Sequence, residues 1–170
     1  MDAMESFVES VPNVSEGTDQ ATLDAIAQSI EGFTGTWLLD RTADPDHGRA
    51  VYTLAGYPGR VMGALETAVG VAIDRIDMNR QVGGHPRLGA VDVIPFVPLG
   101  DTTMEQCVAG AREFGARLAE RYELPVYLYA RAAATPERKI LAQVRRPGYE
   151  GLSEAMARPG GKPDFGPAQP

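Results

Sequence analysis

Residues 83–98 read GGHPRLGAVDVIPFVP, a glycine-rich hinge that runs directly into an apolar stretch. Gly83 and Gly84 allow the backbone to approach a ligand closely, and Pro86 restricts the chain where it leaves the hinge. The run from Leu88 to Val97 is rich in Val, Ile and Phe, which favour strands. We therefore expect this run to form the fourth and longest strand of the chain, with the hinge at its start.

Apolar residues at helical spacing on either side of this stretch predict four helices. The clearest pattern precedes the hinge, and another follows a capping sequence at Asp101–Thr103. A helix near the start opens at Ser15–Thr18 and ends at Gly32, and a last helix covers Pro136–Val144. The expected buried faces of the first three are Leu23, Ile26, Ala27 and Ile30; Val61, Leu65, Ala68, Val69, Ala72, Ile73 and Ile76; and Met104, Cys107, Val108, Ala111, Phe114 and Leu118.

Four further strands are predicted, over Phe7–Val11, Trp37–Asp40, Arg49–Ala55 and Pro125–Tyr129. The second and third strands of the chain are joined by the polar loop 42–48, so we expect them to pair antiparallel. Helices interleaved with such a hairpin are typical of the split β-α-β arrangement. The predicted fold class is therefore α+β, a mixed sheet with helices packed on one face.

Length and composition indicate one domain. The 170 residues suffice for a core that needs neither a disulfide nor a metal. We expect the domain to cover residues 1–157. The composition of residues 158–170 turns to Pro, Gly and Lys, so we expect a tail there, whose segment 164–167 needs another part of the chain to lie against.

Charge and composition exclude several classes of function. Sixteen Lys and Arg against 23 Asp and Glu leave a net charge of -7, which repels a nucleic-acid backbone. No stretch resembles a signal peptide or approaches the roughly 20 apolar residues of a membrane span, so we expect no membrane partner and a cytoplasmic protein. The single Cys107 falls in an apolar helical pattern and indicates a buried thiol. Two histidines and one cysteine lack the spacing of metal ligands, so no metal is expected.

His85 is the strongest candidate for chemistry. The chain has only one other histidine, His47, and imidazole is the side chain that exchanges a proton near neutral pH. Arg87 follows two residues later, where its guanidinium can clasp a carboxylate of a ligand or form a salt bridge to Asp92 or Asp40. An ordinary loop before a strand is the alternative interpretation of the same residues.

Six motifs in one order along the chain resemble the formiminotransferase family, specifically its N-terminal subdomain. Each motif alone is a weak signal, and their shared order makes the resemblance specific. The motifs are Ser10–Gly17, Asp44–Thr53, Ile76–Met78 with His85–Val93, Pro125–Tyr129, Tyr149–Leu152 and Asp164–Pro167.

The resemblance implies a ferredoxin-like α+β fold and a small-molecule reaction. In that reaction a formimino group moves from N-formimino-glutamate to N5 of tetrahydrofolate, without a metal. The resemblance also implies that His85 is the catalytic residue, first as general base and then as general acid. Substrate-binding positions would be Arg87, Asp40, Thr42, Gly84 and Asn13, and the folate-contacting stretch would begin at Gly166 and Pro167.

Three positions depart from the family pattern. Family members carry an acidic residue at the position of Thr42, a histidine at that of Gln81 and a glutamate at that of Gly84. The motif therefore assigns no carboxylate to orient the ring of His85. The residues that remain as substitutes, each of which can equally be a cap or a solvated loop charge, are Glu16, Asp40, Asp44 and Asp46.

Family members also have a second subdomain, and folate lies between the two sheets. We therefore expect a homodimer packed sheet to sheet, or a complex with a separate subunit that supplies a C-terminal-subdomain-like half. Two functional hypotheses stay open. One is an enzyme, acting on formimino-glutamate or on another substrate through formyl transfer, folate cyclisation or a specialised amine or carbonyl reaction. The other is a non-catalytic folate-binding or partner subunit.

Overall fold

The computed structural model describes residues 6–169, and the chain divides into two compact units. Unit 1 comprises the residues up to His85 together with Ala90–Cys107, and unit 2 comprises Pro86–Gly89 and the residues from Val108 onward. Helix α3, Met104–Tyr122, begins in unit 1 and continues in unit 2. None of the helices within residues 6–169 is long and apolar enough to cross a membrane.

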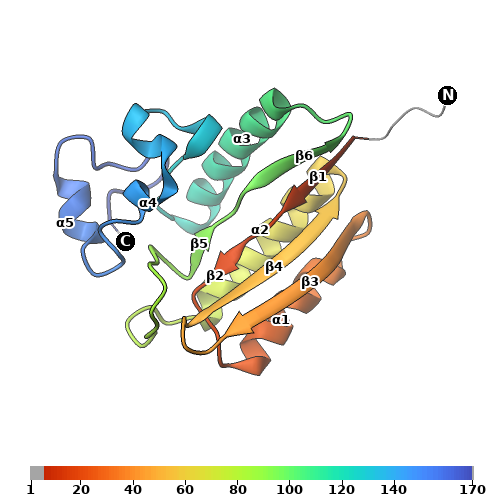
Figure 1. The fold of residues 1–170 in the computed structure, drawn as a ribbon, viewed down its shortest axis with the longest axis horizontal. Helices are drawn as coiled ribbons and strands as arrows, with labels where there is room; N and C mark the ends of the chain where they lie inside the picture. The colour runs from red at the N-terminus through yellow and green to blue at the C-terminus, as the bar shows by residue number, and fades with distance from the viewer. Residues whose placement is uncertain (1–5, 170) are drawn as a thin grey trace. The chain divides into compact units, whose positions relative to one another are not determined.

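The described strands of unit 1 form one six-stranded sheet (Figure 1). They are β1 (Ser6–Ser10), β2 (Asn13–Val14), β3 (Thr36–Asp44), β4 (Arg49–Gly56), β5 (Val91–Val93) and β6 (Phe96–Gly100). Strand β4 pairs with β3 on one side and with β1 and β2 on the other, and these two pair with β6 and β5 in turn. Where the sequence predicts a mixed sheet, every pairing among the described strands is antiparallel. Because β4 lies between β3 and β1, the arrangement is the expected split β-α-β.

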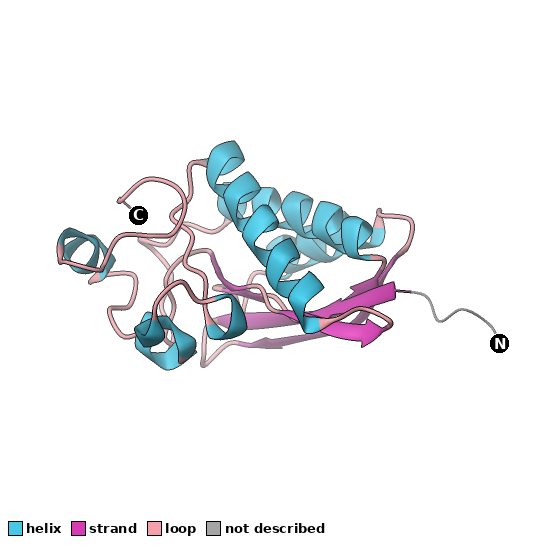
Figure 2. Cartoon of the chain, turned by 90° about the horizontal axis from the view of Figure 1, so that it is seen from above, coloured by secondary structure: helices cyan, strands magenta, loops and turns pink. Residues whose placement is uncertain are grey.

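Helices α1 (Gln20–Glu31) and α2 (Pro58–Arg75) pack against each other on one face of this sheet (Figure 2). Alternation along β4 explains why this face is buried, because Tyr52 and Leu54 are fully buried while their neighbours in the strand are only partly buried. The hydroxyl of Tyr52 donates to the carbonyl of Leu23 in α1 at 3.0 Å, and burial raises the pKa of Tyr52 to about 12. The predicted α+β class, with helices packed on one face, is confirmed.

The opposite face of the sheet, which we call the open face, is left uncovered by α1 and α2. Trp37, Val97 and Leu99 are 51%, 40% and 38% exposed on it. Phe7 pairs with Leu99 across the sheet, and its ring stacks on Tyr57 with the ring centroids 4.9 Å apart. The open face is therefore apolar at the end where these side chains gather.

Unit 2 consists of most of α3 followed by short helices and loops. Its later part folds back on itself, because Val126 and Phe165 form an isolated antiparallel bridge. The segment around Phe165 thus lies against residues 126–128. This agrees with the expectation that segment 164–167 needs another part of the chain to lie against. The short helices are η1 (Ala130–Ala132), η2 (Pro136–Lys139), α4 (Leu141–Val144) and α5 (Leu152–Ala157).

The predicted single strand over Leu88–Val97 is wrong, because β5 and β6 are separate strands on either side of Pro95. Proline has no backbone N–H to give to a ladder, and the carbonyl of Pro95 instead accepts a hydrogen bond from the Ser10 hydroxyl at 2.6 Å. The predicted first strand, Phe7–Val11, corresponds to β1 and ends before Pro12 as expected. The short strand β2 after Pro12 is not predicted; β1 pairs with β6, and β2 pairs with β5.

Three other predicted boundaries are wrong. The polar loop 42–48 is only a turn at 45–48, because β3 extends to Asp44. The segment Pro125–Tyr129 makes a single bridge instead of a strand. The predicted last helix, Pro136–Val144, is divided at Ile140 into η2 and α4.

Candidate active site

His85 lies beside a buried carboxylate. Its Nε2 atom is 3.6 Å from Oδ2 of Asp92 in β5, and the two side chains are 14% and 1% exposed. The distance is that of an ion pair and is too long for a hydrogen bond, so the carboxylate is a charge partner available to an imidazolium at this place. The sequence points to Asp92 only as a partner of Arg87. The contact between His85 and Asp92 could have been predicted from the sequence, because both residues belong to the same motif.

The glycine hinge before His85 is held by the turn between β3 and β4. The backbone N–H groups of Gly84 and His85 donate to the carbonyls of Asp46 and His47 at 3.2 and 3.3 Å. A Cβ atom on Gly83 would lie 2.3 Å from the carbonyl oxygen of His47, a contact that only glycine can make. The sequence predicts a close approach of the hinge to a ligand, whereas the close approach at Gly83 is to the backbone of this turn.

Asp44 organises the turn itself. Its Oδ1 atom accepts the N–H groups of Asp46 and His47 at 2.9 and 3.0 Å, and its Oδ2 atom is 2.6 Å from Nδ1 of His47. These hydrogen bonds, led by the one from the His47 backbone, hold the pKa of Asp44 below its usual range. The ring of His47 is more than half exposed, and the residue supports the hinge through its backbone carbonyl.

Gln81 connects the hinge to the segment before α1. Its amide donates to Oε2 of Glu16 at 2.8 Å, and Oε1 of Glu16 accepts the N–H groups of Gly17, Thr18 and Asp19 at 2.7 to 3.0 Å. Burial of Glu16 raises its pKa, but the hydrogen bonds from the backbone, Gln81 and Thr18 outweigh burial and leave that pKa lowered. Gln81, which replaces the histidine of the family, therefore still supplies a hydrogen-bond donor at this position. The sequence comparison had counted this replacement as the loss of a polar partner.

Three of the predicted substrate-binding residues lie on the open face. Thr42 and Asn13 are both paired with Val51, so cross-strand register brings them into one row. Asp40 precedes Thr42 on the same face of β3, and both side chains are exposed. The amide of Asn13 donates to the carbonyl of Val11 at 3.0 Å. Thr42 lies near the end of β3 that leads into the turn supporting the hinge.

The other predicted binding residues belong to unit 2. Nη2 of Arg87 is 3.0 Å from Oε1 of Glu150, a partner that the sequence did not suggest. The Arg87 side chain is 13% exposed, whereas that of Glu150 is 69% exposed. Gly166 has a φ of +84°, and a Cβ there would lie 2.0 Å from the carbonyl oxygen of Leu124, so the backbone leading into Pro167 is closely packed.

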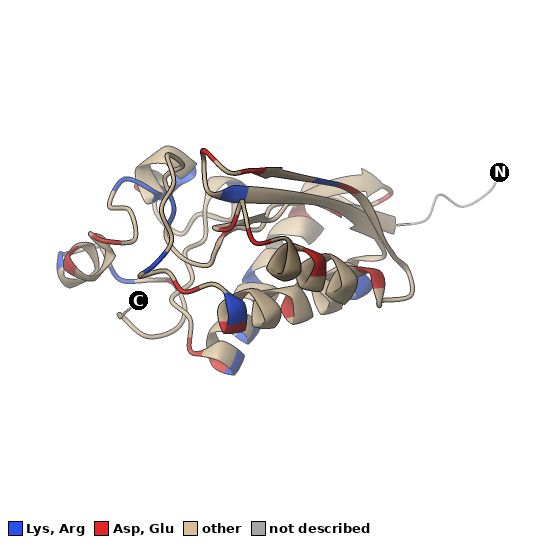
Figure 3. Cartoon of the chain, turned by 90° about the horizontal axis from the view of Figure 1, so that it is seen from below, with Lys and Arg blue, Asp and Glu red and all other residues tan. Residues whose placement is uncertain are grey.

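The two units differ in charge; Figure 3 marks the basic and acidic residues along the ribbon. Unit 2 contains 11 of the 16 Lys and Arg residues and seven of the 23 Asp and Glu residues, which leaves it at +4 while unit 1 is at -11. A positively charged unit favours ligands that carry carboxylates.

The arrangement can accept and return a proton at one place. The group suited to it is the imidazole of His85, which is 14% exposed and has the Asp92 carboxylate 3.6 Å from its Nε2 atom. Within residues 6–169, no group of three or more His, Cys, Asp or Glu side chains is placed to hold a metal ion.

Comparison with known proteins identifies the family. The family model for the formiminotransferase domain, N-terminal subdomain, matches residues 7–170. The chain is 45% identical over 166 residues to the formimidoyltransferase-cyclodeaminase of Dictyostelium discoideum, covering 98% of this chain and 31% of that protein. It is 46% identical over 165 residues to the enzyme of the same name from Mus musculus, covering 97% and 30%. It is also 45% identical over 165 residues to the glutamate formimidoyltransferase of Thermoplasma acidophilum, covering 96% and 54%.

The chain thus spans about a third of the length of the first two relatives and about half of the third. The resemblance carried by the six motifs is confirmed, because the match extends over nearly all of the chain at more than 40% identity. The chain belongs to the formiminotransferase family and corresponds to the N-terminal subdomain of its formiminotransferase domain.

Proposed function

We propose that this chain carries the proton-transfer centre of a glutamate formimidoyltransferase. The reaction would move a formimino group from N-formimino-glutamate to N5 of tetrahydrofolate. The observation that supports it best is the pairing of His85 with the buried Asp92. The family match and the printed names of the relatives give the reaction class.

His85 would act twice in one turnover. N5 of tetrahydrofolate attacks the formimino carbon, a new C–N bond forms, and the proton that N5 sheds passes to His85. The bond from that carbon to the glutamate nitrogen then breaks while His85 returns the proton to this nitrogen, which releases glutamate. Asp92 stabilises the imidazolium between the two steps. General acid–base catalysis of this kind contributes about 10²–10⁴-fold in rate.

Arg87 would bind a carboxylate of one of the two substrates. Its present partner Glu150 is 69% exposed, so this carboxylate can turn into solvent when a ligand carboxylate takes its place at the guanidinium. The charge of +4 on unit 2 supports the same assignment. The folate would contact the chain from Gly166 and Pro167 onward.

The remaining substrate contacts would come from unit 1. We assign them to the hinge and to the exposed polar row of the open face. A threonine hydroxyl at a position that is acidic in the family can still accept a hydrogen bond from the formimino N–H. These contacts are Gly84, Asp40, Thr42 and Asn13.

We also propose that a partner covers the open face in the working protein. Trp37, with 51% of its surface exposed, and Val97, with 40%, form part of an apolar area of the kind that marks interaction sites. The partner would be a second copy of the chain, or a subunit that supplies the further half present in the longer relatives.

One experiment separates this function from a non-catalytic folate-binding role. Tetrahydrofolate is titrated into the chain by calorimetry, and formimino transfer is then measured for the wild type and for His85→Ala. We expect both variants to bind tetrahydrofolate and only the wild type to transfer at a substantial rate. Binding without transfer in the wild type would instead favour a binding subunit or another substrate, and absence of binding would exclude the folate assignment altogether.

A further inference from the structure

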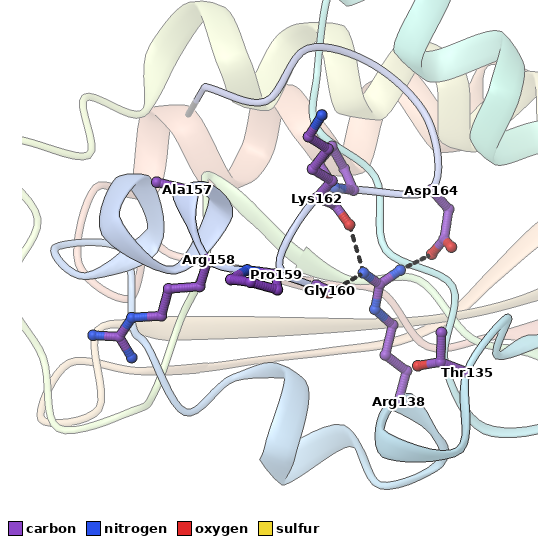
Figure 4. Close-up of a pocket in the computed structure, with 9 residues that line it drawn as sticks. Thr135, Arg138, Ala157, Arg158, Pro159, Gly160, Lys162 and Asp164 are labelled. Atoms are coloured by element: carbon purple, nitrogen blue, oxygen red, sulfur yellow. Dashed lines mark hydrogen bonds and ion pairs between the residues drawn. The ribbon is translucent and has the colours of Figure 1, made fainter.

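The terminal segment of unit 2 is fastened by one arginine (Figure 4). Arg138 in η2 donates from Nη2 to the carbonyls of Gly160 and Lys162, and its Nη1 atom is 2.7 Å from Oδ2 of Asp164. The side chains of Arg138 and Asp164 are each 12% exposed. A single guanidinium therefore contacts three positions within five consecutive residues of the segment.

The same arginine reaches the segment 126–128 on which the terminal segment lies. Its guanidinium lies over the ring of Tyr127, 4.9 Å from the centroid, and the hydroxyl of Tyr127 donates to the carbonyl of Gly161 at 2.9 Å. Oδ2 of Asp164 also accepts the N–H of Leu128 at 2.7 Å. Arg138, Tyr127 and Asp164 thus form one connected cluster between the two segments.

The cluster lies directly before the closely packed end of the segment. Asp164 and Phe165 both donate backbone hydrogen bonds to the carbonyl of Val126, at 2.9 and 3.3 Å. Gly115 in α3 leaves room for the ring of Phe165, since a Cβ there would lie 3.4 Å from it. Beyond this point come Gly166 and then Pro167, so the path of residues 160–165 determines where these two are placed.

A shallow pocket of about 500 Å³ borders the cluster. It contains two further basic residues, but Figure 4 shows the side chains of Arg158 and Lys162 pointing away from the guanidinium of Arg138. Since the guanidinium of Arg138 is engaged by the protein itself, its role is structural and not that of a ligand clasp. The lining residues are Thr135, Arg138, Ala157, Arg158, Pro159, Gly160, Lys162, Pro163 and Asp164.

We infer that Arg138 is a positioning residue for tetrahydrofolate binding. It holds residues 160–165 on segment 126–128 and thereby places Gly166 and Pro167, so the inference rests on the proposed function for the identity of the ligand. Removing the guanidinium leaves the buried Asp164 carboxylate without its cation and the two carbonyls without their donor. The segment then keeps its bridge at Val126 and the hydrogen bonds from Tyr127 and Leu128, without a cation to hold them together.

The test compares Arg138→Gln with Arg158→Gln, its matched control. Arg158 borders the same pocket, but its ion pair with Glu154 is exposed, so it makes a weak contact. Hydrogen exchange is measured by mass spectrometry at the amides of Leu128, Asp164 and Phe165, and tetrahydrofolate affinity is measured by calorimetry. Because Arg138→Gln loses a buried ion pair, we expect its amides to exchange faster and its tetrahydrofolate affinity to be weaker, each by about tenfold or more. We expect little change in Arg158→Gln.

Asp164→Asn provides a second route to the same answer if Arg138→Gln folds poorly. Asparagine keeps an acceptor oxygen but removes the charge. We therefore expect faster exchange and weaker tetrahydrofolate affinity again, with smaller changes than in Arg138→Gln. Unchanged exchange in both variants would overturn the inference. Faster exchange with unchanged tetrahydrofolate affinity would overturn the link to ligand binding. A wild type that binds no tetrahydrofolate would refute the folate assignment of the proposed function, while the exchange data would still decide the structural role of Arg138.

Discussion

Nε2 of His85 lies 3.6 Å from a carboxylate oxygen of Asp92, and the side chain of Asp92 is almost completely buried. One member of this pair belongs to the hinge and the other to β5, which pairs with β2. The position of the imidazole therefore depends on the sheet as well as on the turn that holds the hinge. Formimino transfer, as proposed, requires this pair to act as a unit.

Replacing Asp92 by asparagine should lower formimino transfer much more than ligand affinity. The substitution keeps the size of the side chain but removes the charge that stabilises the imidazolium, so we expect kcat to fall by about 10²–10⁴-fold with a small change in KM. Asp74→Asn, the same chemical change on an exposed position of α2, serves as control. Equal kcat values for wild type and Asp92→Asn would show that the carboxylate has no part in the reaction.

Gly83→Ala should destabilise the fold and Gly84→Ala should not. An added Cβ on Gly83 meets backbone atoms of His47 at 2.3 Å, whereas one on Gly84 has Asp46 as its nearest contact at an ordinary 3.8 Å. Because the turn and the hinge must separate to admit the methyl group, we expect Gly83→Ala to lose roughly 1–3 kcal/mol. Urea unfolding measures both variants, and equal losses from them would contradict the close packing of the hinge on the turn.

The stability supplied by Glu16 should depend on pH. Its pKa is lowered from the usual 4.5 in the folded chain, so the ionised form stabilises the fold above that value and the contribution is lost as pH falls through the lowered pKa. Glu16→Gln should therefore unfold with roughly 1–3 kcal/mol less free energy than the wild type at neutral pH. The gap should narrow on acidification below pH 4.5. Glu31→Gln, at an exposed position of α1, is the control. If the difference in unfolding free energy between wild type and Glu16→Gln stays constant across this range, the ionised Glu16 carboxylate does not stabilise the fold.

A polar substitution on the open face should prevent assembly without unfolding the chain. Trp37 is 51% exposed and contributes little to the core, so Trp37→Ser should retain the thermal stability of the wild type within a few degrees. We expect light scattering at micromolar concentration to give the mass of a dimer or complex for the wild type and of a monomer for Trp37→Ser. A wild type that is monomeric and co-purifies with no partner would contradict the proposed coverage.

The helices could be predicted from sequence because their burial follows a local period. Leu23, Ile26 and Ile30 in α1 are buried as expected, and so is Cys107 in α3. Each of these positions is decided by spacing along one helix, and no knowledge of distant partners is needed. The end of α1 at Gly32 was also predicted, but its predicted start at Ser15–Thr18 is wrong, because α1 begins at Gln20 with the Asp19 side chain as its cap.

The strands and the site depended on partners far away in sequence. Pro12 lies between β1 and β2, and Pro95 lies between β5 and β6. Only the strand register shows that these two breaks lie opposite each other, because β1 pairs with β6 and β2 pairs with β5. The pattern over Pro125–Tyr129 suits a strand, yet the segment finds a partner only at Phe165. The contact of the hinge with His47 depends likewise on a distant hairpin turn, which no motif spacing indicates.

The central claim is that the imidazole of His85 transfers the proton, and the single-turnover rate of His85→Ala with and without added imidazole tests it most directly. If the claim holds, formimino transfer falls by about 10²–10⁴-fold in His85→Ala, and free imidazole restores part of the loss by entering the space that the side chain leaves. A His85→Ala variant that transfers the formimino group as fast as the wild type, with imidazole making no difference, would contradict the account.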